Sequence, residues 1–178
     1  MSRPTAGEAR RLVLLRHAKA EHHGGVSDEM RTLTPAGRRQ AAHVGSLLAQ
    51  EGLAPDMVLC SVSVRTRQTY ELLANALDAA PQVEYSEELY DAGISGTLAL
   101  LADVAPSART VLVVGHEPVM SGVAVSLAGP GSDPAALVRV QSGVPTGAFA
   151  VLDVASSWHE LRRGGALLTS VLVAPHHG

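Results

Sequence analysis

Aromatic residues are scarce in this sequence of 178 residues, which contains one Trp, one Phe and three Tyr. Its formal net charge is only −3, so it also has no excess of basic residues. Surfaces that bind nucleic acids combine basic side chains with aromatic rings on which bases stack. With neither feature present, we expect no nucleic-acid partner.

Cysteine is nearly absent as well. Cys60 is the single cysteine, so the chain cannot form an internal disulfide. No apolar run approaches the roughly 20 residues of a membrane-spanning helix. Only four apolar residues separate the leader MSRPTAGEARR from Arg16, too few for a signal peptide. These absences predict a soluble, cytoplasmic protein with no membrane partner.

Internal repeats and low-complexity segments are missing too, and 46% of the residues are hydrophobic. A chain of this length buries roughly 70% of its unfolded surface in one core. We therefore predict one domain over residues 1–178, in which residues 1–10 form a flexible leader.

Short apolar runs alternate with helix signals along the chain. The runs are typical of strands covered on both faces, and they occupy residues 12–15, 57–61, 82–86, 110–116, 148–154 and 166–174. Helices are predicted over 35–51, with Thr34 as N-cap, and over 64–80, 97–104 and 118–127. Residues 128–147 are rich in Gly and Pro and are read as a loop with room for a short helix. The pattern predicts an α/β fold, a three-layer α/β/α sandwich with a mostly parallel central sheet and an antiparallel edge.

Cationic side chains follow three of the predicted strands. Arg16 and His17 follow the first strand, Arg65 follows the second, and His116 and Glu117 follow the fourth. Ligands of open α/β sheets bind beyond the carboxyl ends of the strands, where these residues should meet. Forked guanidinium groups there favour a phosphoryl dianion.

A neutral histidine is a competent nucleophile toward phosphorus, and the phosphorylated imidazole hydrolyses in a second step. Phosphoryl transfer otherwise needs positioning and charge neutralisation, which we expect from the arginines and a second, protonated histidine.

Five segments resemble one known family in order and spacing across nearly the whole chain. They are RHAKA (16–20), LTPAG (33–37), CSVSVRTRQT (60–69), VVGHEP (113–118) and PTGA (145–148). On these segments the sequence resembles the histidine phosphatase superfamily, also called phosphoglycerate-mutase-like, and most closely its short SixA-type phosphohistidine phosphatases.

The resemblance implies the phosphoglycerate-mutase-like fold and a role for each matching residue. His17 is the implied nucleophile, Arg16 and Arg65 are implied phosphate ligands, and His116 is the second histidine of the phosphate pocket. No metal or cofactor is implied. The implied function is a phosphatase that hydrolyses a phosphohistidine protein or a phosphomonoester; a small-metabolite phosphatase and a catalytically weak phosphoprotein-binding module are the alternatives.

The proton donor of the family transfers less directly. Its acid follows the third strand, where this chain reads YSEELYDAG, so Glu87, Glu88 and Asp91 compete. Glu117, directly after the second histidine, is a fourth candidate. We favour Glu88.

The chain lacks the long insertion that forms a lid in the mutases of the family, which argues against a mutase. An open pocket suits a phosphorylated side chain of another protein, and the P–N bond of phosphohistidine depends less on a strong acid. The loops 22–30 and 129–147 are expected to shape selectivity.

Several other residues invite a functional reading but fit a structural one better. Cys60 and Arg65 form C-x4-R, one residue short of the cysteine-phosphatase motif, so Cys60 is read as a buried thiol. Lys19 is either a solvated loop charge or a substrate contact, and Arg67 a surface charge or a ligand. The remaining residues are expected to have structural or surface roles: Gln68, Thr69, Trp158, His43, His159, and the adjacent pairs His22 and His23, His176 and His177.

Overall fold

One six-stranded sheet forms the centre of the molecule in the computed structural model, which describes residues 9–22 and 24–175. The strand order is β3-β2-β4-β1-β5-β6. The strands are β1 (Arg10–Arg16), β2 (Met57–Ser61), β3 (Gln82–Ser86), β4 (Thr110–Gly115), β5 (Ala148–Val154) and β6 (Ala166–Val173).

The sheet is parallel in one half and antiparallel in the other. Strands β3, β2, β4 and β1 run parallel to one another, whereas β5 pairs antiparallel with both β1 and β6. This arrangement confirms the predicted mostly parallel sheet with an antiparallel edge. It brings the carboxyl ends of β1, β2 and β4 to one end of the sheet.

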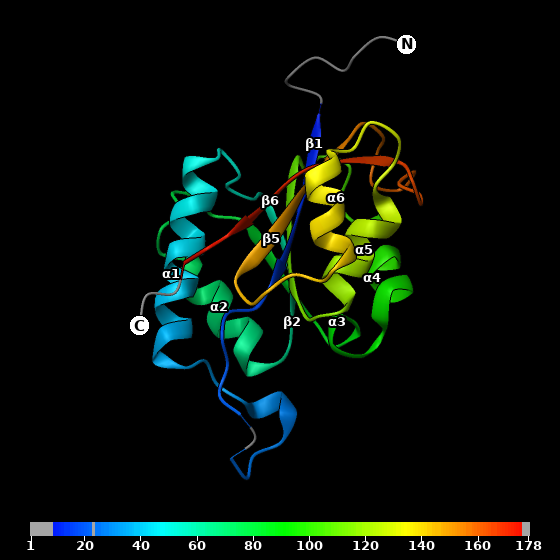
Figure 1. Ribbon diagram of the computed structural model, residues 1–178. Coiled ribbons are helices and arrows are strands. Elements are labelled where there is room, and N and C mark those ends of the chain that lie inside the picture. The colour runs from blue at the N-terminus through cyan, green and yellow to red at the C-terminus, as the bar shows by residue number, and fades with distance from the viewer. Residues whose placement is uncertain (1–8, 23, 176–178) are drawn as a thin grey trace.

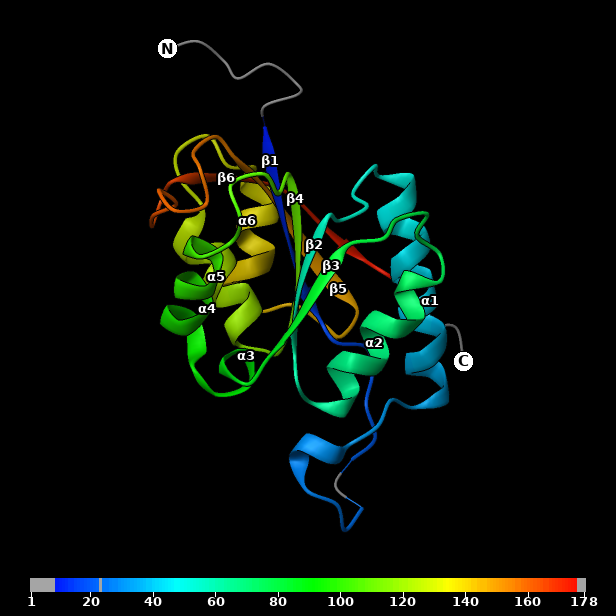
Figure 2. The same cartoon turned by 180° about the vertical axis from the view of Figure 1, so that it is seen from behind.

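Helices cover both faces of the sheet, with α1 and α2 on one face and α3 to α6 on the other (Figures 1 and 2). Successive residues of β1 supply the two cores, because side chains alternate between the faces of a strand. Leu12 and Leu14 join the core beneath α4, α5 and α6, while Val13 and Leu15 pack with Val44 of α1 and its neighbours. The alternation explains why these strands read as continuous apolar runs.

The helix bounds follow the capping signals in the sequence. The side chains of Thr34, Ser63 and Asp133 each accept a hydrogen bond from a first-turn N–H of α1, α2 and α6. The helices are α1 (Pro35–Gln50), α2 (Val64–Ala74), α3 (Glu88–Asp91), α4 (Gly93–Ala102), α5 (Val119–Leu127) and α6 (Pro134–Gln141), with a 3-10 turn η1 at Asp28–Met30. Helix α6 lies within residues 128–147, the region predicted to be a loop that could contain a short helix.

Several boundaries differ from the prediction. Strand β1 begins at Arg10, so the leader cannot extend to residue 10, and residues 1–8 lie outside the described part of the chain. Helix α2 ends at Ala74, not at residue 80; residues 75–80 are mostly exposed, and Leu77 is the one of them that packs against the core.

Helix α4 starts at Gly93, four residues earlier than expected, because Ile94 already packs against the core. The short helix α3 was not predicted. Within the described residues, no helix has the length and apolar character needed to cross a membrane.

Candidate active site

The predicted cationic residues meet at the carboxyl end of the sheet. Strands β1 and β4 are in register, with Arg16 opposite Gly115, and the His17 N–H donates to the Gly115 carbonyl at 3.1 Å. The imidazole rings of His17 and His116 therefore lie near each other, with their centroids 5.5 Å apart. Arg65 reaches the same place from the first turn of α2, next to its N-cap Ser63.

A cavity of about 480 Å³ opens between these residues. Its lining contains the four side chains predicted to bind phosphate or act on it, Arg16, His17, Arg65 and His116. The other charged or titratable lining residues are Lys19, His22, Arg31 and Glu117. The cavity is therefore dominated by cationic groups and suits an anion.

His17 is buried and held in one tautomer. Its Nδ1 lies 2.8 Å from the carbonyl oxygen of Ala18, which only accepts hydrogen bonds, so the proton sits on Nδ1 and the lone pair on Nε2. Burial is the main reason why the pKa of His17 falls from 6.5 to about 3; the hydrogen bond to Ala18 opposes this shift, and the nearby His116, Arg65 and Arg16 add to it. His17 is thus neutral at physiological pH, as a nucleophile must be.

The segment after His17 is fixed by a residue that the sequence analysis assigned to structure. The Thr69 hydroxyl accepts from the Ala18 N–H at 3.1 Å and donates to the Arg65 carbonyl at 2.7 Å. Thr69 therefore ties the nucleophile's loop to the helix that carries Arg65. Gln68 also has a structural role, since its side-chain oxygen accepts from the Leu33 N–H at 2.8 Å.

His116 is neutral in this structure, so the expectation of a protonated second histidine is wrong for the protein without phosphate. Its Nδ1 lies 3.2 Å from Nη2 of Arg65, which only donates, and its Nε2 donates to the Ser61 hydroxyl at 2.8 Å. Burial, followed by the charge of Arg65, lowers the pKa of His116 to about 4.

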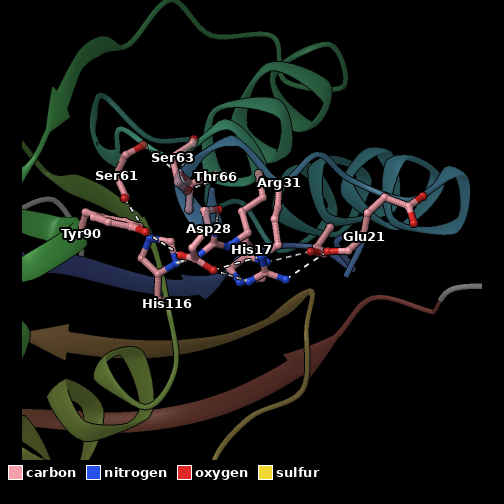
Figure 3. Close-up of polar contacts among 11 residues, drawn as sticks. His17, Glu21, Asp28, Arg31, Ser61, Ser63, Thr66, Tyr90 and His116 are labelled. Atoms are coloured by element: carbon pink, nitrogen blue, oxygen red, sulfur yellow. Dashed lines mark hydrogen bonds and ion pairs between the residues drawn. The ribbon is translucent and has the colours of Figure 1, made fainter. Parts of the chain in front are cut away.

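Arg65 is almost completely buried, with 4% of its surface exposed, and its charge is balanced by an unpredicted partner. Its Nη1 donates to the Asp28 carbonyl at 2.7 Å and its Nη2 to the Asp28 carboxylate at 3.0 Å. Figure 3 shows Asp28 among the polar residues around His116 and Tyr90. The Nε atoms of both Arg65 and Arg16 are buried without a hydrogen-bond partner among the described residues. Both arginines line the cavity, so an anion bound there can accept hydrogen bonds from these donors.

Sequence reasoning missed Asp28, Arg31 and Tyr90. The Tyr90 hydroxyl donates to the Asp28 carboxylate at 2.5 Å, and Nε of Arg31 does so at 3.0 Å. The bonds from Tyr90, and then from Arg65 and Arg31, hold the pKa of Asp28 well below its usual range. Asp28 lies in the loop 22–30, for which a part in selectivity was expected, but no local motif marked it.

The favoured proton donor does not reach the cavity. Glu88 is exposed at the start of α3, Glu87 and Asp91 are exposed beside it, and none of the three lines the cavity. The residue of this segment that contacts the site is Tyr90, whose ring lies edge-on to His116 at 5.4 Å. Tyr90 points inward while Glu88 does not, because helical turns direct neighbouring residues to different faces.

The rival readings resolve as structural features. Cys60 is fully buried at the end of β2, and burial raises the pKa of its thiol to about 12, so it cannot serve as a thiolate. Trp158 is fully buried and donates to the Ala108 carbonyl at 2.8 Å. The guanidinium of Arg67 lies over the Tyr85 ring, 5.3 Å from its centroid, away from the cavity. Lys19 is exposed but lines the cavity, which leaves a substrate contact open.

The remaining histidines show no metal-binding arrangement within the described ranges, where no group of three His, Cys, Asp or Glu residues is suited to hold an ion. His43 and His159 are exposed, and His43 Nδ1 lies 3.0 Å from the Pro175 carbonyl. His23, His176 and His177 lie outside the described residues.

The two buried histidines predict how stability depends on pH. Both have pKa values well below the ordinary 6.5, so the unfolded chain binds more protons than the folded one between about pH 4 and 6.5. Stability should be complete above pH 6.5 and decline as the pH falls. Urea unfolding at pH 7.5 and pH 5 should differ by up to about 2 kcal/mol per histidine.

The loss should shrink by about half in a His17→Asn variant, which has one titrating group fewer. The carboxylate of Asp28 stabilises the fold above about pH 4 and loses this contribution only as the pH falls further, so it does not affect the comparison of pH 7.5 with pH 5. Equal stability at pH 7.5 and pH 5 would contradict neutral, buried imidazoles.

A doubly covered α/β sheet whose strand ends surround one cavity with two arginines and two histidines provides a site suited to a phosphoryl group. Comparison with known proteins agrees. The model of the histidine phosphatase superfamily (branch 1) matches residues 12–95. An uncharacterized protein of Mycobacterium tuberculosis is 39% identical over 86% of this chain and 96% of its own length.

Solved structures give the same answer over the whole fold. A putative phosphohistidine phosphatase SixA from Nakamurella multipartitia is 37% identical, with a TM-score of 0.81 over 93% of this chain and 96% of that one. Its counterpart from Agrobacterium tumefaciens is 31% identical, with a TM-score of 0.76 over 92% and 97% of the two chains. The chain belongs to the histidine phosphatase superfamily, is SixA-like within it, and is a phosphatase.

Proposed function

We propose that this phosphatase removes the phosphoryl group from phosphohistidine on another protein through a phosphorylated His17. The observation that carries the proposal is the state of His17, a buried, neutral imidazole with its Nε2 lone pair free beside Arg16 and Arg65. The similarity to proteins named phosphohistidine phosphatase SixA supports the substrate class. The predicted cytoplasmic location remains a prediction.

The first chemical step transfers the phosphoryl group to His17. Nε2 forms a bond to phosphorus while the bond from phosphorus to the leaving group breaks, and the Nδ1 proton stays on the bond to the Ala18 carbonyl. The leaving group takes the electron pair of the broken bond and must be neutralised by a proton. In a phosphohistidine substrate, solvent can supply this proton to the ring nitrogen that does not carry the phosphoryl group. The leaving group is then a neutral imidazole.

The second step returns the enzyme to its starting state. A water molecule attacks phosphorus, the bond to Nε2 breaks, and inorganic phosphate leaves. Arg16 and Arg65 neutralise the phosphoryl oxygens in both steps through donors fixed in advance, which is the main source of catalysis in phosphoryl transfer. A dianion beside His116 favours its protonated form, so the charge expected on this histidine arises on binding.

Among the described residues, no carboxyl group is available as an acid in the cavity, and both ring nitrogens of His116 are engaged, with Arg65 and with the Ser61 hydroxyl. This supports phosphohistidine over a phosphomonoester as the substrate. Glu88 is outside the cavity, the Asp28 carboxylate is held ionised, and Glu117 accepts three hydrogen bonds. An alkoxide leaving group departs poorly without a proton donor. Phosphoserine should therefore be a much poorer substrate.

A substrate panel tests this proposal. We expect kcat/KM for a phosphohistidine peptide to exceed that for the matched phosphoserine peptide by at least about 100-fold, the size of a missing general acid. p-Nitrophenyl phosphate, whose leaving group needs no proton, should fall between them. Phosphate release is measured in all three cases.

Each alternative has its own outcome in that panel. Turnover of sugar phosphates faster than of the phosphohistidine peptide would identify a small-metabolite phosphatase. Tight binding of the phosphohistidine peptide without phosphate release would identify a binding module. Equal rates with phosphoserine and phosphohistidine would overturn the argument from the absent acid.

A further inference from the structure

Glu117 is the one acidic side chain among the residues that line the cavity, yet its hydrogen bonds point away from acid catalysis. One carboxylate oxygen accepts from the Ser121 N–H at 2.7 Å. The other accepts from the Ser121 hydroxyl at 2.8 Å and from the Val144 N–H at 3.1 Å. All three partners donate, so both carboxylate oxygens are held in a fixed orientation by hydrogen bonds.

The bond to Val144 connects Glu117 to a phosphate ligand. Val144 lies in the loop 143–147, and its carbonyl accepts from Nη1 of Arg16 at 2.9 Å. This is the one hydrogen bond that the described part of the chain provides to the guanidinium of Arg16, whose Nε is buried without a partner. Val144 thus contacts both side chains, because its N–H donates to the Glu117 carboxylate and its carbonyl accepts from Arg16.

The loop is shaped for this contact. Gly143 has a φ of +83°, and a Cβ atom there would lie 3.3 Å from the Glu117 carboxylate. At the other end, Nε2 of the fully buried Gln40 donates to the Thr146 carbonyl at 2.9 Å. The Gly147 N–H donates to the His17 carbonyl at 3.1 Å. The far end is thus fixed without Glu117, which leaves Val144 as the part that Glu117 controls.

We propose that Glu117 is a positioning residue, which aims Arg16 at the phosphoryl group by holding the backbone at Val144, and that it is not the proton donor of the reaction. The inference rests on the proposed function only in assuming that Arg16 binds the phosphoryl group. It gives a role to Glu117, which directly follows the second histidine and which the sequence alone left as a candidate for the proton donor.

The sign of the effect on phosphate binding separates positioning from simple electrostatics. A carboxylate beside a phosphate dianion repels it, so neutralising Glu117 would by charge alone tighten binding. Loss of positioning weakens binding instead. Ser121→Ala provides the cleaner variant, because it removes one hydrogen bond from Glu117 and leaves every charge in place.

The experiment compares Glu117→Gln, Glu117→Ala and Ser121→Ala with the unaltered chain in calorimetric binding of inorganic phosphate. We expect Kd to rise about tenfold for Glu117→Ala and about threefold for Glu117→Gln and Ser121→Ala, the scale of one or two hydrogen bonds. Glu160→Gln, an exposed residue outside the cavity lining, is the matched control and should leave Kd unchanged.

A kinetic comparison gives the second measurement. For a positioning residue, each variant should lower kcat/KM by the same factor for a phosphoserine peptide and for p-nitrophenyl phosphate. For a proton donor, Glu117→Gln would slow the phosphoserine peptide far more, because only that leaving group needs the proton. Circular dichroism and thermal unfolding establish whether each variant is folded. If Glu117→Ala does not fold, Ser121→Ala still tests the inference.

Unchanged or tighter phosphate binding in Glu117→Gln and Ser121→Ala would overturn the inference, as would a loss confined to the poor leaving group. If the unaltered chain bound no phosphate, the proposed function would fail instead. The two failures are therefore distinguishable.

Discussion

Replacing His17 with asparagine is expected to lower kcat by roughly 10⁴-fold or more, the loss seen when a covalent nucleophile is removed. Asparagine can still donate to the Ala18 carbonyl, which His17 Nδ1 contacts at 2.8 Å, but it provides no lone pair equivalent to Nε2. Arg16 and Arg65 are untouched by the change. Inorganic phosphate should therefore still bind, which separates loss of the nucleophile from loss of the pocket.

Two measurements check this result. Steady-state phosphate release gives kcat, and rapid quenching of the unaltered chain with a 32P-labelled substrate should trap an acid-labile, base-stable phosphoprotein that His17→Asn does not form. His159→Asn, at an exposed position, is the matched histidine control. Normal turnover by folded His17→Asn would show that another group attacks phosphorus.

Arg65→Lys is expected to have the second-largest effect. Lysine keeps the positive charge but loses the planar fork, and Arg65 uses that fork to contact Asp28 with both terminal nitrogens while Nε remains available. We expect kcat to fall roughly 100-fold to 1000-fold, as when a fixed donor to a transition-state oxygen is lost. Phosphate should also bind more weakly, which calorimetry measures.

Asp28→Asn should move phosphate binding in the opposite direction. The carboxylate of Asp28 occupies Nη2 of Arg65 at 3.0 Å and competes for it with an incoming dianion. Without that charge, we expect inorganic phosphate to bind about fivefold more tightly, equivalent to about 1 kcal/mol.

Glu29→Gln is the matched control for this variant, because it removes a charge from the same 3-10 turn at an exposed position. Its effect on phosphate binding should be smaller than that of Asp28→Asn. Weaker phosphate binding by Asp28→Asn would show that Asp28 supports the anion site and does not compete with it. Arg65→Lys and Asp28→Asn therefore each change one partner of the ion pair between Arg65 and Asp28, and they are expected to change phosphate binding in opposite directions.

The sequence by itself determined the sheet, the main helices and the central residues of the site. Apolar runs such as residues 110–114 have no alternative to a doubly covered strand, and Thr34 followed by Pro35 marks the start of α1. Residues that directly follow parallel strands meet at one edge, so His17 and His116 could be placed together from their positions in the chain alone.

Only the tertiary structure decided which acids enter the cavity and how its groups are charged. Asp28 reaches Arg65 across 37 residues and Tyr90 reaches Asp28 across 62, and no local pattern records such distances. Glu88 and Tyr90 are two residues apart, yet a single helical turn exposes the first and directs the second inward. The neutral state of His116 likewise depends on burial and on the approach of Arg65 in space. Strand ends are set by local sequence, whereas side-chain contacts and pKa values depend on whatever distant segments the fold brings alongside.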